Sequence, residues 1–229
     1  SDLQTQKRAM TSKTFGIVLS FLLLGQLGFV LFNQIFETIF NLFGFTMLKA
    51  VESASAGSDS VSMFLYASFF GPVSEELIFR GAGLRTFEKY GKIFAILMSS
   101  LLFGLFHGNL PQFVFATFVG MIFSYVTLEY SIFWAMIFHI FNNLVIGEGL
   151  TYLYSFLSDD VGGALHLLIL LIGAGIAVSF LFKNKTDIKR YVRRNRAYPG
   201  TYRQAFRSVW FWLFVFFMCL TSLTLIRHL

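Results

Sequence analysis

Charged residues are scarce in this chain. Lys, Arg, Asp and Glu make up 13% of its 229 residues, whereas a soluble domain carries about 25%. Hydrophobic residues make up 56%, among them 31 phenylalanines, and the mean hydropathy is +0.68. Such a chain lacks the polar groups that would cover its surface in water, but it does not need them in lipid. The composition therefore argues against a soluble protein and predicts an integral membrane protein.

Cysteine is nearly absent, and we expect no cleavable signal peptide in this sequence. The single cysteine, Cys219, lies in an apolar run, so no intrachain disulfide can form, and no partner base for a thiol nucleophile is near it. The first apolar stretch, residues 14–36, is too long for the hydrophobic region of a signal peptide, and no small-residue cleavage site follows it. We expect Cys219 to be a small apolar residue of a helix and residues 14–36 to remain as a membrane span.

Long uncharged stretches predict an all-α polytopic protein with about seven transmembrane helices, since one span needs about 20 apolar residues. Residues 93–128 would make a helix of about 54 Å, too long for one crossing of a core of about 30 Å. We therefore place a break at the Gly-Asn-Leu-Pro sequence of residues 108–111. Residues 38–48 are too few to cross and are expected to lie on the surface or re-enter. The expected spans are residues 14–36, 60–80, two within 93–128, 130–147, 161–182 and 208–226.

The basic residues are distributed asymmetrically over these spans. Sixteen of the eighteen lysines and arginines fall on one side, leaving Lys49 and Arg227 on the other. The positive-inside rule then places the N-terminus and the basic loop of residues 183–207 in the cytoplasm. We expect this loop to contact anionic lipid headgroups rather than nucleic acid. With no internal repeat and no low-complexity tract, residues 1–229 are expected to form a single membrane-embedded domain.

Three groups of polar residues lie inside the predicted spans, where an unpaired polar group costs several kcal/mol and is by default a candidate functional residue. In the first group, Glu76 and Arg80 are four residues apart and share a helix face, which favours a structural ion pair. Glu75 lies about 100° away and has no local partner. The alternative is that all three side chains reach the membrane interface, although two adjacent carboxylates are an unusual way to build one.

The other two groups contain histidine. His107 lies just before the break at residues 108–111, and a lone histidine in a helix is more often a satisfied core residue than a catalytic one. His139 and Asn143 share a helix face at a spacing of four. Asn142, at a spacing of three, is also within reach, so the spacing leaves open which of the two amides faces inward.

These groups form three motifs in order: Glu75-Glu76-x-x-x-Arg80, then Phe103-x-x-x-His107, then His139-x-x-x-Asn143. On successive hydrophobic segments, this pattern resembles the CPBP (Abi) family, which includes the type II CAAX prenyl endopeptidases. The resemblance covers residues 71–143. It implies a helical membrane fold around an intramembrane polar cavity, and cleavage of a peptide bond near the C-terminus of a lipid-modified or amphipathic substrate. Similar proteins in bacteria are associated with bacteriocin immunity and peptide-signal processing, which suggests a bacterial plasma membrane.

Peptide hydrolysis needs a base for water and donors for the developing oxyanion. We assign Glu75 as the base and expect His107 to orient the same water or accept its proton. His139 and Asn143 would supply the donors. In the alternative mechanism, Glu75, His107 and His139 would bind a metal such as Zn²⁺ with water as fourth ligand. The sequence lacks HExxH, and we favour water activated by Glu75.

Two other functions fit part of the pattern. A non-catalytic scaffold or immunity protein could retain the fold, but intact Glu75, His107 and His139 argue against a degenerate copy. A small transporter would also explain buried Glu, Arg and His, but two halves with matching broken helices are not seen in the sequence.

Counted along their predicted spans, Glu75 and His107 lie at different depths in the membrane. The two side chains can therefore meet only if their helices tilt or are staggered.

Overall fold

The computed structural model describes residues 8–55 and 60–228, which form helices and one pair of two-residue strands. The predicted all-α fold is confirmed. The elements are α1 (Ser12–Leu42), β1 (Phe45–Thr46), α2 (Leu48–Ser55), α3 (Val61–Leu65), η1 (Tyr66–Phe70), α4 (Gly71–Glu76), η2 (Leu77–Gly83), α5 (Leu84–Glu88), α6 (Lys92–Phe106), α7 (Leu110–Glu129), α8 (Ile132–Ile140), η3 (Phe141–Gly149), α9 (Leu150–Tyr154), α10 (Asp159–Lys183), α11 (Lys185–Arg194), α12 (Thr201–Ala205), α13 (Val209–Leu223) and β2 (Arg227–His228), where η denotes a π-helix.

Four helical segments in the described part of the chain are long and apolar enough to cross a membrane. They are α1, α7, the continuous run from α8 to α9, and α10. The apolar helices α6 and α13 have 15 residues each, and the run of residues 61–88 carries the charged motif. Each predicted span therefore coincides with a helix, but a count of seven crossings stays a prediction.

Two local features differ from the expectation. Residues 38–42, expected to lie on the surface or re-enter, continue α1. At about 1.5 Å per residue this 31-residue helix is longer than a core of about 30 Å, so α1 must tilt or extend beyond it. The antiparallel strands β1 and β2, with Phe45 opposite His228, were not predicted because each has only two residues.

The predicted break between α6 and α7 is confirmed. Gly108 has φ +57°, a left-handed conformation that favours glycine. Asn109 then caps α7, where its side-chain oxygen accepts from the backbone N–H of Gln112 at 3.3 Å. The Asn109 amide nitrogen also donates to the carbonyl of Ala50 at 2.8 Å. The break therefore fixes α2 against the beginning of α7.

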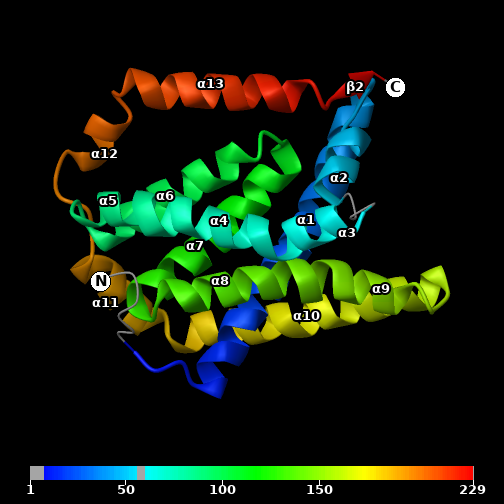
Figure 1. Cartoon of the computed structure of the whole chain (residues 1–229), viewed down its shortest axis with the longest axis horizontal. Coiled ribbons are helices and arrows are strands. Elements are labelled where there is room, and N and C mark those ends of the chain that lie inside the picture. The colour runs from blue at the N-terminus through cyan, green and yellow to red at the C-terminus, as the bar shows by residue number, and fades with distance from the viewer. Residues whose placement is uncertain (1–7, 56–59, 229) are drawn as a thin grey trace.

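Helix α10 packs against α1 and contacts α9, and Figure 1 shows α13 along the edge of the molecule beyond α6. In Figure 1, α5, α11 and α12 lie toward one end of the molecule, and α2, α9 and β2 lie toward the other. The elements that carry most of the basic residues thus gather at one end. This grouping is what the predicted orientation requires, while the compartment that this end faces stays a prediction.

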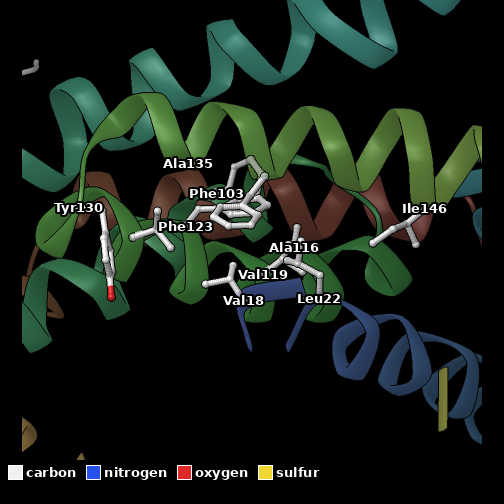
Figure 2. Packing of buried hydrophobic residues seen from close by; sticks show 11 residues of the cluster. Val18, Leu22, Phe103, Ala116, Val119, Phe123, Tyr130, Ala135 and Ile146 are labelled. Carbon is white, nitrogen blue, oxygen red and sulfur yellow. The ribbon is translucent and has the colours of Figure 1, made fainter. Parts of the chain in front are cut away.

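The hydrophobic core lies where α1, α6, α7 and α8 meet (Figure 2). Leu22, Phe103, Phe123 and Phe138 are all buried there. Helices α6 and α7 approach closely at Gly104, where a Cβ atom would collide with Thr117. Small residues permit such close contacts between helices in membranes. Phe103 and Phe123 also contact residues of the polar motifs.

Candidate functional site

The helical run that carries Glu75, Glu76 and Arg80 is interrupted by two π-helical segments. Pro72 has no N–H to donate, and its ring would clash with the carbonyl four residues earlier in a regular α-helix. The helix widens to the π-helix η1 directly before α4, which begins at Gly71 and Pro72. A second π-helix, η2, contains Arg80, and a third, η3, follows His139. Short π-helical segments occur frequently at functional sites.

The predicted ion pair between Glu76 and Arg80 is present. Nη1 of Arg80 donates to Oε1 of Glu76 at 3.0 Å, and both side chains are fully buried. The guanidinium lies over the ring of Phe103, with Cζ 4.2 Å from the ring centroid. Gly120 of α7 leaves space for it, because a Cβ atom there would lie 3.0 Å from Nη2 of Arg80. Arg80 is therefore enclosed by a carboxylate, an aromatic ring and a glycine.

Glu76 has a second partner that the sequence did not predict. Nδ1 of His139 lies 2.9 Å from the same Oε1 of Glu76. Because a carboxylate can only accept, Nδ1 carries the proton. The ring of His139 stacks on Phe123 at a centroid distance of 4.9 Å. Helical spacing within one segment could not reveal this contact, since the two residues are 63 positions apart.

This contact turns the other nitrogen of His139 toward Glu75. Nε2 lies 3.6 Å from Oε2 of Glu75, and the Glu75 side chain is 24% exposed, against 0% for Glu76. His139 therefore stands between one accessible and one buried carboxylate.

His107 joins this group from the C-terminal end of α6. Its Nδ1 lies 2.9 Å from the carbonyl of Phe103, and since a carbonyl can only accept, the neutral ring keeps a lone pair on Nε2. The rings of His107 and His139 both make edge contacts with the ring of Phe103, at centroid distances of 5.0 and 5.8 Å. The structure therefore brings together Glu75, His107 and His139 from three helical segments, although linear placement had put Glu75 and His107 at different depths.

Asn143 and Asn142 are both engaged in hydrogen bonds. Nδ2 of Asn143 donates to the carbonyl of Ala67 in η1 at 3.0 Å. Nδ2 of Asn142 donates to Oδ1 of Asn143 at 3.1 Å, and Nε2 of Gln26 in α1 donates to Oδ1 of Asn142 at 3.3 Å. Sequence reasoning missed Gln26. Its signal was an amide in the middle of an otherwise apolar span, a polar group that needs a partner in lipid.

The metal alternative finds no support in this arrangement. Within residues 8–55 and 60–228, no group of three or more His, Cys, Asp or Glu side chains is placed to hold a metal ion. Glu75 and His139 are close, but they do not form such a group with His107.

An apolar cavity of about 380 Å³ lies between α13 and the α6–α7 break. Its lining includes Gly108, the residue that follows His107. Other lining residues are Leu101, Leu105, Phe113, Val215 and Met218. The cavity therefore reaches the chain segment that carries His107.

Comparisons with known proteins cover the segment with the motifs. Residues 57–145 match the model of the family described as type II CAAX prenyl endopeptidase Rce1-like. A Bacillus subtilis (strain 168) protein named "Putative membrane peptidase YdiL" is 34% identical over 89 residues, which are 37% of this chain and 35% of that protein. The chain thus spans about a third of that relative's length. No solved structure matches the chain. The resemblance predicted from the motifs is confirmed over residues 57–145, where this integral membrane protein is similar to type II CAAX prenyl endopeptidases and to the Bacillus subtilis protein.

Proposed function

We propose that this protein is an intramembrane endopeptidase in which Glu75 activates water. The observation that carries the proposal is the 3.6 Å separation of Oε2 of Glu75 and Nε2 of His139, and His107 contacts the same Phe103 ring as His139. An accessible carboxylate beside two imidazoles combines a base with groups that can hold or donate a proton. A purely structural ion pair would not need Glu75, because Glu76 already neutralises Arg80.

In the proposed reaction, water attacks the carbonyl carbon of the scissile peptide bond and gives its proton to Glu75. His107 accepts a hydrogen bond from the same water at Nε2. The protonated Nε2 of His139 and the second N–H of the Asn143 amide donate to the oxyanion. The C–N bond then breaks, and Glu75 returns its proton to the leaving amine. Glu76 holds Nδ1–H of His139, so the imidazolium is oriented and stabilised throughout.

The substrate is proposed to be a membrane-associated peptide or a lipid-modified protein. The support is the apolar cavity beside His107, since an apolar substituent placed there would hold a neighbouring peptide bond near the polar groups. Remote binding of this kind contributes to rate by positioning the bond that reacts.

Anionic lipid headgroups are proposed as a second partner, bound by α11. The half-buried residues of this segment repeat every three or four positions and face the protein, while Lys185, Lys189 and Arg193 lie exposed on another face. The hydroxyl of Tyr191 donates to Oε1 of Glu129 at 2.9 Å, and burial together with the Glu129 carboxylate raises the pKa of Tyr191. The protonated tyrosine thereby fixes α11 with its basic face outward.

A proteomic comparison of membranes tests the peptidase proposal. Cells would carry the wild-type protein, Glu75→Gln, or the matched control Glu52→Gln, whose side chain is exposed in α2. We expect new peptide ends in wild-type and Glu52→Gln membranes that disappear in Glu75→Gln. If all three membranes contain the same peptide ends while the proteins are equally abundant, the endopeptidase proposal is wrong. The scaffold or immunity function would then be the better account.

A further inference from the structure

A chain of side-chain amides crosses the interior of the bundle from α1 to η1. It runs from Gln26 through Asn142 and Asn143 to the carbonyl of Ala67, with donor–acceptor distances of 3.3, 3.1 and 3.0 Å. Three segments far apart in the sequence contribute to it. Asn142 is buried, and Gln26 and Asn143 are half-buried.

The direction of every hydrogen bond in this chain follows from its last acceptor. A backbone carbonyl can only accept, so Asn143 must turn its nitrogen toward Ala67 and its oxygen away from it. That oxygen needs a donor, which fixes the nitrogen of Asn142 toward Asn143. The oxygen of Asn142 then needs a donor in turn, and Gln26 provides it. The hydrogen-bond network therefore determines which atom of each amide is nitrogen and which is oxygen.

This direction has a chemical consequence for Asn143. Its amide nitrogen carries two N–H groups, and the bond to Ala67 uses one of them. The other N–H is left as a donor one helical turn from His139. An amide turned the other way would present an oxygen, which repels an oxyanion. The orientation of Asn143 therefore decides whether it can stabilise a developing negative charge.

We propose that Gln26 is a positioning residue for the peptidase reaction and acts through Asn142 to hold the Asn143 amide in the orientation that the Ala67 carbonyl requires. This inference rests on the proposed function. Gln26 touches neither Glu75 nor the substrate in the proposed reaction. Its role is to supply the terminal donor, without which the Asn142 amide is free to rotate and the oxygen of Asn143 loses the donor that holds it.

Two substitutions of Gln26 test the proposal, with the rate of formation of the Glu75-dependent peptide ends as readout. Gln26→Met keeps a side chain of similar length but removes the donor. We expect it to slow cleavage roughly tenfold or more, since misplacing a group that supports the transition state has effects of this order. The control Gln34→Met changes an exposed residue of the same helix and should cleave at the wild-type rate. Thermal unfolding of the solubilised proteins separates loss of rate from loss of fold.

The second substitution, Gln26→Glu, adds a signature that a packing role would not produce. An ionised carboxylate can only accept, so it draws the Asn142 nitrogen toward itself and away from the Asn143 oxygen, whereas a protonated carboxyl can donate to Asn142. The cleavage rate of Gln26→Glu relative to wild type should therefore rise as the pH falls. Gln26→Met, compared with wild type in the same way, should give a constant ratio.

The outcomes separate this inference from the function beneath it. If Glu75→Gln abolishes the peptide ends but both Gln26 variants cleave like wild type, the positioning role is wrong and the peptidase stands. The positioning role is also wrong if both Gln26 variants cleave more slowly only because they are less stable to heat, and if the cleavage rate of Gln26→Glu relative to wild type does not change with pH. Gln26 would then have only a packing role. If Glu75→Gln abolishes no peptide end, both proposals fail together.

Discussion

His139 shares one carboxylate oxygen with Arg80: its Nδ1 lies 2.9 Å from Oε1 of Glu76, which also accepts from Nη1 of Arg80 at 3.0 Å. Glu76, which was expected to be purely structural, thereby contacts His139, which was expected to take part in the reaction. The buried Glu76 orients the imidazole through Nδ1 and leaves Nε2 for Glu75. Glu76 and Arg80 thus serve both the stability of the bundle and the geometry of the site.

Replacing Arg80 should destabilise the protein, whereas replacing Glu75 should not. Arg80→Ala leaves Glu76 charged and buried without its main partner, and breaking a buried pair costs about 3–5 kcal/mol. Glu75→Gln changes a partly exposed side chain outside that pair. Thermal unfolding of the detergent-solubilised proteins measures the difference. Equal destabilisation by both substitutions would show that Glu75 is also structural.

Glu76→Gln should reduce cleavage strongly even in protein that remains folded. A neutral glutamine no longer stabilises the imidazolium of His139, and when its amide oxygen accepts from Nδ1–H the neutral ring keeps a lone pair on Nε2, where the proposed reaction needs a donor. We expect a loss of at least about 100-fold, the upper range for residues that orient a functional group. The measurement is the yield of Glu75-dependent peptide ends per folded protein, with Glu52→Gln as control. Cleavage at the wild-type rate would exclude an orienting role for Glu76.

Gly120→Ala should destabilise the site from the side of α7. The added methyl group would lie 3.0–3.2 Å from Arg80, Phe103 and Ser100, and overpacking a close contact costs about 1–3 kcal/mol. Gly175→Ala makes the matched control in α10, where a Cβ atom meets nothing within 4 Å. Thermal unfolding should show a lower transition for Gly120→Ala alone. An unchanged transition would mean that Arg80 can shift without loss.

The orientation is testable by cysteine labelling in a Cys219→Ala background. Ser12→Cys and Thr186→Cys lie at the end of the molecule predicted to face the cytoplasm, and Ser155→Cys lies between α9 and α10 at the other end; all three positions are exposed. An impermeant thiol reagent applied to intact cells should label only Ser155→Cys, because the other two face inward by the positive-inside rule. Labelling of Ser12→Cys or Thr186→Cys in intact cells would show that the predicted orientation is wrong.

Neutralising the basic face of α11 should weaken the interaction with anionic lipid. Each basic residue near a charged surface contributes about 1 kcal/mol, so the triple substitution Lys185→Gln, Lys189→Gln, Arg193→Gln should lose most of the thermal stabilisation that added phosphatidylglycerol gives. The control, Lys49→Gln with Arg227→Gln, changes exposed residues of α2 and β2 at the other end of the molecule and should respond like wild type. Two results would contradict headgroup binding by α11. In the first, phosphatidylglycerol stabilises the wild type and the triple variant equally. In the second, zwitterionic phosphatidylcholine stabilises the wild type as much as phosphatidylglycerol does.

The amino-acid sequence by itself determined the class of protein and the identity of the motif residues. Hydropathy alone places helices in lipid, because every backbone polar group must be satisfied within a segment there. The Gly-Asn-Leu-Pro break was predictable since glycine and proline act through local backbone geometry. The pairing of Glu76 with Arg80 was predictable because both residues share one face of one helix.

Only the tertiary structure decided how these residues are connected across the bundle. The contact between Glu76 and His139 and the amide chain from Gln26 join residues 63 and 116 positions apart, and no helical period relates such positions. The extension of α1 through residues 38–42 was likewise not visible in hydropathy, which detects spans but not where a helix continues beyond them. Packing decided these features because a buried polar group takes its partner from whichever helix lies opposite, and that is fixed only when the helices have assembled.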